Sequence, residues 1–182
     1  MASTMTGPQS GGCLCGKIKY QIQSAAEPVY SVICHCDNCK RATGTHCLCN
    51  TIFQKDVCTF EFHCKLPAAL DGPAPDLPQH FSLISGAPKI YRDGATDSGT
   101  PLYRHFCSDC GSGLFITTPL VDGIVSILSG TLDKAAVNWK PNKEQYIEAK
   151  SHWLPDFELI EKEGVHLRHA KGPSLDILKP AE

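Results

Sequence analysis

Short runs in which apolar and polar residues alternate recur along the chain, and they predict its secondary structure. From Leu14 onward, the apolar residues Leu14, Ile18, Tyr20 and Ile22 alternate with polar ones, with the period of two that is typical of a half-buried strand. We predict further short strands at residues 29–33, 47–53, 57–62, 81–84, 103–106, 114–117, 124–128 and 146–150. Helical turns are expected only at residues 37–42 and 132–136. Many short strands separated by Gly- and Pro-rich turns indicate an all-β fold of short antiparallel strands.

The length of 182 residues corresponds to about one domain. We place a disordered tail at residues 1–10, the domain at residues 11–160 and a peripheral C-terminal extension at residues 161–182. Residues 65–79 carry four prolines, and residues 92–101 are rich in Gly, Asp and Thr, so both are predicted as long loops. Such loops are either lids or specificity loops, or tolerated surface insertions, and the sequence leaves both interpretations open.

Composition and charge argue against several function classes. The chain has 17 basic and 19 acidic residues, a net charge of −2, and lacks the basic excess of nucleic-acid-binding domains. No stretch approaches 18 consecutive apolar residues, so we expect no membrane partner. The N-terminus lacks the basic start and the apolar core of a secretory signal, which favours a cytoplasmic protein. The sequence carries no signal for an oligomeric state.

Eleven cysteines are the most informative feature of the composition. An odd count and a chain long enough to build a core argue against disulfide bonds and favour zinc–thiolate sites. The spacing supports zinc, because a C-x-x-C pair fits a tight turn and a C-x-C pair on a strand places both sulfur atoms on one face. The cysteines fall in the groups Cys13/Cys15, Cys34/Cys36/Cys39, Cys47/Cys49 and Cys107/Cys110, with Cys58 and Cys64 alone.

Counting ligands separates two metal sites. Together, the pairs Cys13/Cys15 and Cys107/Cys110 supply four thiolates, the number that closes a structural zinc site, provided that the two segments meet. Cys34, Cys36 and Cys39 supply three ligands from one segment, which leaves the fourth tetrahedral position open, as in catalytic zinc sites. Closure of this second site by a fourth cysteine or by His35 is the alternative, but His35 lies between two ligands and is expected to point away.

Three segments carry a resemblance to a known family. They are residues 12–16 (GCLCG), 34–44 (CHCDNCKRATG) and 104–112 (RHFCSDCGS), and residues 130–133 (GTLD), Tyr146 and Trp153 extend the match. In this order they closely resemble the glutathione-dependent formaldehyde-activating enzyme family, which includes centromere protein V. The resemblance covers roughly residues 11–154 and implies a β-tent fold organised around zinc.

The same resemblance implies a division of the cysteines that agrees with the ligand count. It implies two zinc ions per chain: a structural zinc on Cys13, Cys15, Cys107 and Cys110, and an active-site zinc on Cys34, Cys36 and Cys39. It also implies glutathione as co-substrate and an aldehyde as small-molecule partner. The chain departs from the family pattern at His46, Cys47 and Cys49, and its loop at residues 65–79 is longer than usual.

The ligand set indicates the chemistry. Three thiolates give a zinc centre a net charge of −1 and make it a weaker Lewis acid toward water, but suit it to hold a substrate thiol as the reactive thiolate. We therefore expect a carbon–sulfur lyase or adduct-forming enzyme that acts on glutathione and an aldehyde or a glutathione conjugate. One alternative, motivated by His46 and the long loops, is a zinc enzyme that hydrolyses or dehydrates a specialised metabolite. The other is a non-catalytic zinc-binding recognition module.

Four further residues are candidates for the site. Arg41 and Arg104 lie beside ligand motifs and are candidates to bind the carboxylates of glutathione, with exposed charge on a solvated face as the alternative. His46 and His105 are candidate proton donors, because imidazole titrates near neutrality, although a lone histidine is more often structural. The remaining cysteines are expected to pack as small buried hydrophobic residues: Cys47, Cys49, Cys58 and Cys64.

Overall fold

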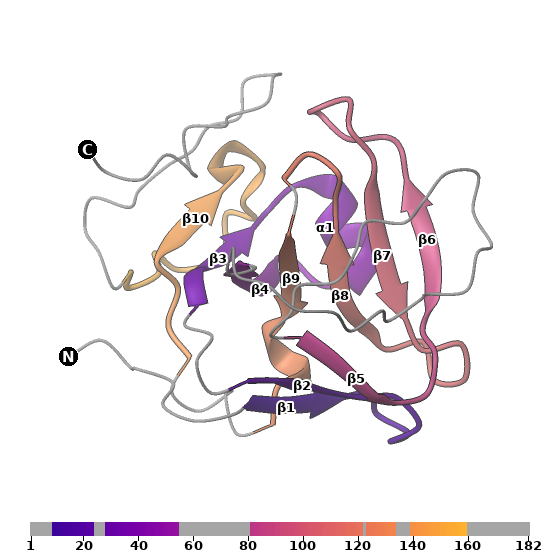
Figure 1. The fold of residues 1–182 in the computed structure, drawn as a ribbon. Helices are drawn as coiled ribbons and strands as arrows, with labels where there is room; N and C mark the ends of the chain where they lie inside the picture. Colours follow the sequence, from indigo (N-terminus) through magenta and orange to yellow (C-terminus); the bar gives the residue numbers. More distant parts are fainter. Residues whose placement is uncertain (1–8, 24–27, 55–80, 122, 134–138, 160–182) are drawn as a thin grey trace, which may run out of the picture.

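Two β-sheets form the described part of the chain (Figure 1). The computed structural model describes residues 9–23, 28–54, 81–121, 123–133 and 139–159. Its elements are β1 (Gln9–Gly12), β2 (Lys19–Ile22), β3 (Pro28–Cys34), α1 (Asp37–Thr43), β4 (Leu48–Gln54), β5 (Phe81–Ser85), β6 (Lys89–Asp93), β7 (Leu102–Phe106), β8 (Gly113–Thr117), β9 (Ile124–Leu128), η1 (Ser129–Thr131), β10 (Lys143–Gln145) and η3 (Ile147–Ala149). The predicted all-β fold class is confirmed.

The sheets differ in size and in strand order. The small sheet has the order β1-β2-β5 and is antiparallel throughout. The large sheet has the order β10-β3-β4-β9-β8-β7-β6, and its pairs are antiparallel except for β10, which runs parallel to β3. In Figure 1 the small sheet lies across the lower end of β8 and β9. None of the described helices is long and apolar enough to cross a membrane.

An aromatic core joins the small sheet to the large one. Tyr20 on β2 stacks on Phe81 on β5 with 5.3 Å between ring centroids, and Phe81 meets the ring of Phe115 on β8 at 4.8 Å. The three rings are buried together with the aliphatic side chains Ile22, Leu114, Val125 and Ile127. Because burying one such side chain contributes about 1.5–3 kcal/mol, this core holds the two sheets together.

Strand β8 is buried on both faces. Phe115 faces the aromatic core, and its neighbour Ile116 belongs to a second buried cluster with Cys34, Cys39 and Leu48. The continuous apolar run of this strand is typical of a strand that is covered on both sides. β8 therefore connects the core between the sheets to the segment that carries three clustered cysteines.

Most strand predictions are confirmed, but the chain around the first cysteines differs from prediction. The predicted strand from Leu14 begins only at Lys19, and the residues before it form a turn in which Leu14 is 90% exposed. The backbone N–H of Cys13 donates to the carbonyl of Ile18, and Gly16 adopts the left-handed conformation that a tight turn requires. The two cysteines of this turn are two residues apart, which is also the spacing of residues on one face of a strand, and this led to the strand prediction.

Other differences concern element boundaries. The strand predicted at 146–150 is the 3-10 turn η3, preceded by β10. Of the helical turn predicted at 132–136, residues 134–136 lie outside the described residues. Residues 9 and 10 belong to β1 rather than to a tail, and residues 92 and 93 end β6, a strand missing from the prediction, rather than begin a loop. The strand at 57–62, the loop at 65–79 and the extension at 161–182 lie outside the described residues.

The packing predicts unequal costs for two aromatic truncations. Phe115→Ala removes a fully buried ring from the aromatic core, so we expect a loss of about 3–5 kcal/mol in the free energy of unfolding. Tyr91→Ala is the control, because Tyr91 is 60% exposed on β6 and its loss is expected to change stability by about 0.5 kcal/mol or less. Urea unfolding curves measure both values. Similar losses in the two variants would contradict this account of the core.

Candidate functional site

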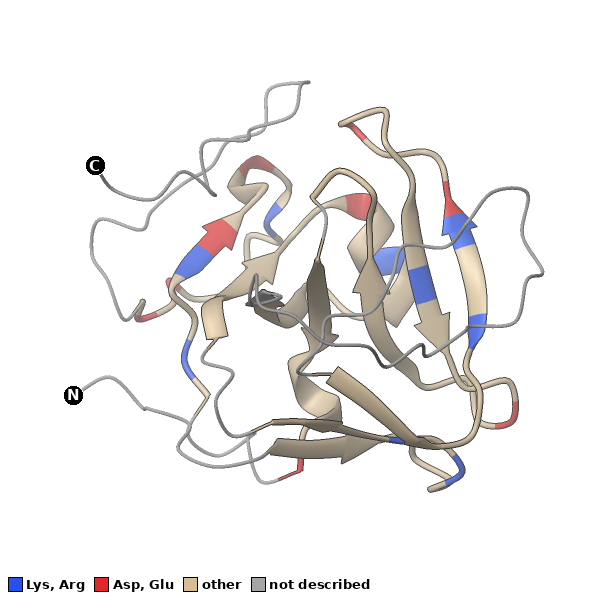
Figure 2. Ribbon diagram, in the orientation of Figure 1, with Lys and Arg blue, Asp and Glu red and all other residues tan. Residues whose placement is uncertain are grey.

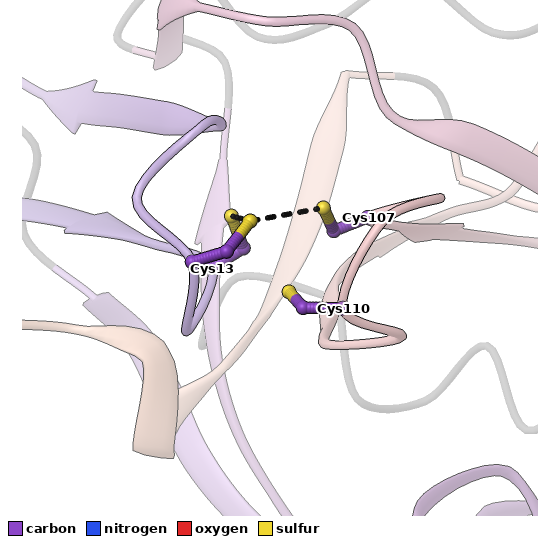
Figure 3. Close-up of side chains that lie close together, drawn as sticks. Cys13, Cys107 and Cys110 are labelled. Atoms are coloured by element: carbon purple, nitrogen blue, oxygen red, sulfur yellow. Dashed lines mark hydrogen bonds between the residues drawn. The ribbon is translucent and has the colours of Figure 1, made fainter.

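Four cysteines from two distant turns form the first cluster, called here the four-cysteine site. Cys13 and Cys15 lie in the turn between β1 and β2, and Cys107 and Cys110 lie in the turn between β7 and β8. Their sulfur atoms all lie within 4.8 Å of one another, with 3.4 Å between Cys13 and Cys15 and 3.7 Å between Cys15 and Cys107. Figure 3 shows the sulfur atoms of Cys13, Cys107 and Cys110 facing one another from the two turns.

These distances fit a zinc ion. Four sulfur atoms placed about 2.3 Å from zinc at the corners of a tetrahedron stand about 3.8 Å apart. The surroundings favour a thiolate at two of the four positions, and at the first of these the backbone N–H of Ile18 donates to the sulfur of Cys13. Hydrogen bonds with Ser112 lower the pKa of Cys110 to about 5. The four residues predicted as a structural site are therefore together and chemically suited to zinc.

The two turns are also tied to each other outside the sulfur atoms. Lys17 after the first turn forms an ion pair with Asp109 in the second. The backbone N–H of Leu14 donates to the hydroxyl of Ser112, 3.1 Å away. Gly111, which closes the second turn, has a positive φ of 74° and donates its N–H to the carbonyl of Cys107. The polypeptide thus brings the two cysteine pairs together through contacts beyond the sulfur atoms themselves.

Three cysteines from one continuous segment form the second cluster, the three-cysteine site. Cys34 ends β3, Cys36 is the N-cap of α1, and Cys39 lies in the first turn of that helix. The three sulfur atoms lie within 4.8 Å of one another, and the N–H of Cys39 donates to the sulfur of Cys36. Among the described residues, no fourth Cys, His, Asp or Glu joins this cluster.

The electrostatics of the three-cysteine site favour a thiolate. Hydrogen bonds from Cys34 and then Cys39 lower the pKa of Cys36 to about 2, while the contacts of Cys34 with Cys36 and then Cys39 raise the pKa of Cys34. Cys34 and Cys39 are buried, and Cys36 is half-buried. The donor set, three sulfur atoms with one partly accessible, therefore suits a zinc ion with an open position.

His35 points away from the sulfur atoms, as the sequence predicts. Its ring is fully buried, and Nε2 lies 2.7 Å from a carboxylate oxygen of Glu144 on β10. The same oxygen lies 3.0 Å from Nζ of Lys150. The backbone N–H of His35 donates to the carbonyl of Gln145, next to the parallel pairing of Gln145 with Cys34. Strand β10 thus fixes the segment between two of the clustered cysteines.

A polar bridge lies on the other side of the three-cysteine site. Nε of Arg104 donates to the buried carboxylate of Asp93 at 2.9 Å, and the side-chain amide of Asn38 donates to that carboxylate and to the carbonyl of Ala95. Burial lowers the pKa of Arg104, but the negative charges of Cys39 and Asp93 raise it overall. Arg104 therefore stays cationic beside the cysteines.

Two cavities flank this bridge. The small cavity, about 340 Å³, is lined by Cys36, Asp37, Asp97 and Tyr146 among others. The large cavity, about 510 Å³, contains none of the three clustered cysteines in its lining but shares Asn38, Ala95 and Arg104 with the small one. Figure 2 shows basic residues on α1, β6 and β7, the elements around these cavities.

The four candidate residues that the sequence predicts beside the cysteines differ in their position relative to the two cavities. Arg104 lines both cavities, and Arg41, an exposed residue of α1, lines the large one. His105 also lines the large cavity, but it is buried against Phe115 and Thr117, and burial lowers its pKa to about 4, so it is neutral near pH 7.

His46 lies apart from the other three. Its Nδ1 is 2.9 Å from the hydroxyl of Ser151, its ring packs edge-on against Trp153, and it lines neither cavity. Cys47 and Cys49, predicted as buried hydrophobic residues, are half-buried free thiols. Burial raises the pKa of Cys49 to about 11. Cys58 and Cys64 lie outside the described residues.

Several residues of the site have no signal in the sequence. The side chains of Asp93 and Asn38 form a hydrogen bond although the residues are 55 positions apart in the sequence, and those of Glu144 and His35 do so at a separation of 109 positions. Tyr146, which the sequence marks only as part of a family motif, is the single described non-glycine residue with a positive φ, 57°. A strained backbone at the edge of a cavity is typical of functional positions, and this feature is visible only in three dimensions.

Comparisons with known proteins agree with the cysteine geometry. The family model named glutathione-dependent formaldehyde-activating enzyme matches residues 8–65 and 77–149, which include both cysteine clusters. No curated protein sequence matches the chain. The crystal structure of a Rhodobacter sphaeroides protein is 14% identical, with a TM-score of 0.45 over 69% of this chain and 88% of that one, a similarity too low to carry an argument. On the family match, the chain belongs to the glutathione-dependent formaldehyde-activating enzyme family.

Proposed function

We propose that this protein is a zinc-dependent carbon–sulfur lyase or adduct-forming enzyme that acts on glutathione and an aldehyde, or on a glutathione conjugate. The observation that carries the proposal is the three-cysteine site, in which three sulfur atoms cluster without a fourth described ligand and Cys36 lines a cavity. We assign one zinc ion to this site and a second, structural one to the four-cysteine site. Thiolate ligands need a reducing compartment, which supports a cytoplasmic location.

The proposed reaction adds a thiol to a carbonyl group, or reverses that addition. The three cysteines would hold a zinc ion, which would bind a substrate thiol as its thiolate, the nucleophilic form. In the forward direction a carbon–sulfur bond forms, the carbonyl π bond breaks, and the proton lost from the thiol is balanced by one gained at the carbonyl oxygen. In the lyase direction the same bonds change in reverse.

The small cavity offers groups that match glutathione, which carries one amine and two carboxylates. Asp37 and Asp97 supply negative charge toward an amine, and Arg104 supplies a cation toward a carboxylate. Arg104 is held in place by Asp93, so its guanidinium is preorganised rather than free to move. Arg41 at the large cavity is the second candidate cation.

Tyr146 is our candidate for the hydrogen-bond donor at the carbonyl oxygen. It lines the small cavity with Cys36, and its side chain packs in the buried cluster of Cys34 and Cys39. Burial, and then the negative charges of Asp97, Cys36 and Cys34, raise the pKa of its hydroxyl, so the group stays protonated at neutral pH. A protonated hydroxyl stabilises the negative charge that develops on a carbonyl oxygen under attack.

Neither alternative function gains support from the described contacts. His46, which motivated water chemistry, is bound to Ser151 and lines neither cavity. Basic and acidic residues are interspersed over the strands, as Figure 2 shows, with no described element that is basic throughout.

The two cysteine sites predict different outcomes for serine variants. A structural zinc–thiolate site contributes about 10–16 kcal/mol in small domains, while a whole domain is stable by about 5–15 kcal/mol. We therefore expect Cys110→Ser to unfold or precipitate. Cys39→Ser removes a ligand from one local segment, and we expect it to fold, lack one zinc and be inactive.

Cys49→Ser is the matched control, because Cys49 is half-buried and belongs to neither cluster; it is expected to keep both zinc ions. Circular dichroism and zinc content distinguish the variants. Equal unfolding of Cys39→Ser and Cys110→Ser would show that the three-cysteine site is structural as well.

The proposed thiol binding predicts a pH dependence. Glutathione is expected to bind more tightly than S-methylglutathione, because only the free thiol ionises. Below the thiol pKa of about 8.5, binding releases a proton, so affinity rises with pH by up to about tenfold per unit and levels off above that pKa. Calorimetric titration at several pH values measures this slope. Equal affinity of the two compounds, with no rise, would remove thiolate binding from the mechanism.

The proposed role of Tyr146 predicts a loss of turnover without a loss of binding. Tyr146→Phe keeps the ring in the buried cluster but removes the hydroxyl, and we expect kcat to fall by about 10²–10³-fold, as for loss of one oxyanion donor. The Kd of glutathione is expected to change little. Tyr30→Phe, at a tyrosine of β3 that lines neither cavity, is the control. An unchanged kcat in Tyr146→Phe would exclude the hydroxyl from the reaction.

A further inference from the structure

The large cavity has a wall that formaldehyde and glutathione do not explain. Leu48, Phe106, Phe115, Ile116 and Leu128 line it, and its volume of about 510 Å³ lies in the range of pockets that enclose whole organic molecules. Formaldehyde has one carbon atom, and glutathione is charged and polar. Neither molecule gains from an apolar wall of this extent, because only apolar surface is stabilised by contact with it.

The apolar wall is continuous with the three-cysteine site. Leu48 and Ile116 line the large cavity and also pack in the buried cluster of Cys34 and Cys39. Leu128, the last residue of β9, lines the cavity and packs against the same cluster. The apolar wall of the large cavity therefore packs against the cluster that contains Cys34 and Cys39.

The polar bridge divides the two cavities by chemistry. Asn38 and Arg104 line both cavities, so the two volumes adjoin at these residues. On the small-cavity side lie Cys36 and the acidic residues suited to a charged peptide. On the large-cavity side lie the leucines, the isoleucine and the phenylalanines, with Arg41 and His105 among its polar lining residues. This arrangement suits a substrate with a polar half and an apolar half joined at a sulfur atom.

We propose that the large cavity binds the apolar group of an aldehyde larger than formaldehyde, so that the substrate is the hemithioacetal of glutathione with an alkyl or aryl aldehyde. The inference rests on the proposed function and names its substrate class. In that compound the thiol has added across the C=O bond: the sulfur is bonded to the former carbonyl carbon, and the oxygen carries a proton. Cleavage breaks the carbon–sulfur bond and returns one proton to sulfur, with no change of oxidation state.

The test uses stable conjugates in which CH₂ replaces the CH(OH) group. S-methyl-, S-propyl- and S-hexylglutathione are titrated into the zinc-loaded full chain by calorimetry, beside glutathione itself. Each CH₂ that enters an apolar cavity is expected to raise affinity about fourfold until the cavity is full. S-hexylglutathione is therefore expected to bind at least about 100-fold more tightly than S-methylglutathione.

Variants of Leu128 test whether the gain in affinity with alkyl chain length comes from the large cavity. Leu128→Trp adds bulk to the large cavity and is expected to abolish most of the gain from the hexyl group. Because Leu128 also packs against the cluster of Cys34 and Cys39, the gain is measured within the variant, relative to its own affinity for S-methylglutathione, and its zinc content is checked. Leu128→Ala enlarges the cavity and is expected to reduce the gain per CH₂, which keeps the test valid if the tryptophan variant does not fold. Ile84→Trp, at a 59% exposed position of β5, is the matched control.

The outcomes separate this inference from the proposed function. If glutathione binds but affinity does not rise with chain length, the apolar subsite is wrong and the proposed function stands. The apolar subsite is equally wrong if the chain-length gain is identical in the wild type and both Leu128 variants. If glutathione itself does not bind, the proposed function fails, and this inference fails with it.

Discussion

Convergence of two cysteine turns at the four-cysteine site is the constraint on which the rest of the structure depends. One turn belongs to the small sheet and the other to the large sheet, so their contact fixes the two sheets at one end of the aromatic core. Cys13 and Cys107 are themselves buried members of that core. With the sheets fixed in this way, β8 has apolar neighbours on both faces, and one of those faces supports the three-cysteine site.

The three-cysteine site differs because its ligands come from one short segment. Its geometry is supplied locally by the end of β3 and the first turn of α1, and it is supported from two sides by contacts distant in sequence. On one side Glu144 holds His35, and on the other the bridge of Arg104, Asp93 and Asn38 separates two cavities. The zinc ion that we propose for this site would therefore exchange a ligand between rigid walls without disturbing the fold.

The sequence predicts what local spacing determines. The C-x-C and C-x-x-C spacing predicts the three-cysteine cluster and each cysteine pair of the other cluster, because short spacing brings sulfur atoms together directly. The meeting of Cys13 and Cys15 with Cys107 and Cys110 follows only from the ligand count and the family resemblance, since Cys15 and Cys107 are 92 residues apart. The turn at Leu14 is misjudged because alternating cysteines there have the period of a strand. Asp93, Glu144 and the cavities escape prediction, since they arise from pairings across 55 or more residues that no local pattern encodes. The positive φ of Tyr146 is not predicted from the sequence for the same reason.

The central claim is that the three-cysteine site has an open position that a substrate thiol fills. X-ray absorption spectroscopy at the zinc edge counts sulfur ligands directly. With two zinc ions per chain, one closed and one open, the average is expected to be about 3.5 sulfur ligands per zinc ion, rising to about 4 when glutathione saturates the protein. An average of about 4 before glutathione is added, or an average that does not rise on saturation, would contradict the account.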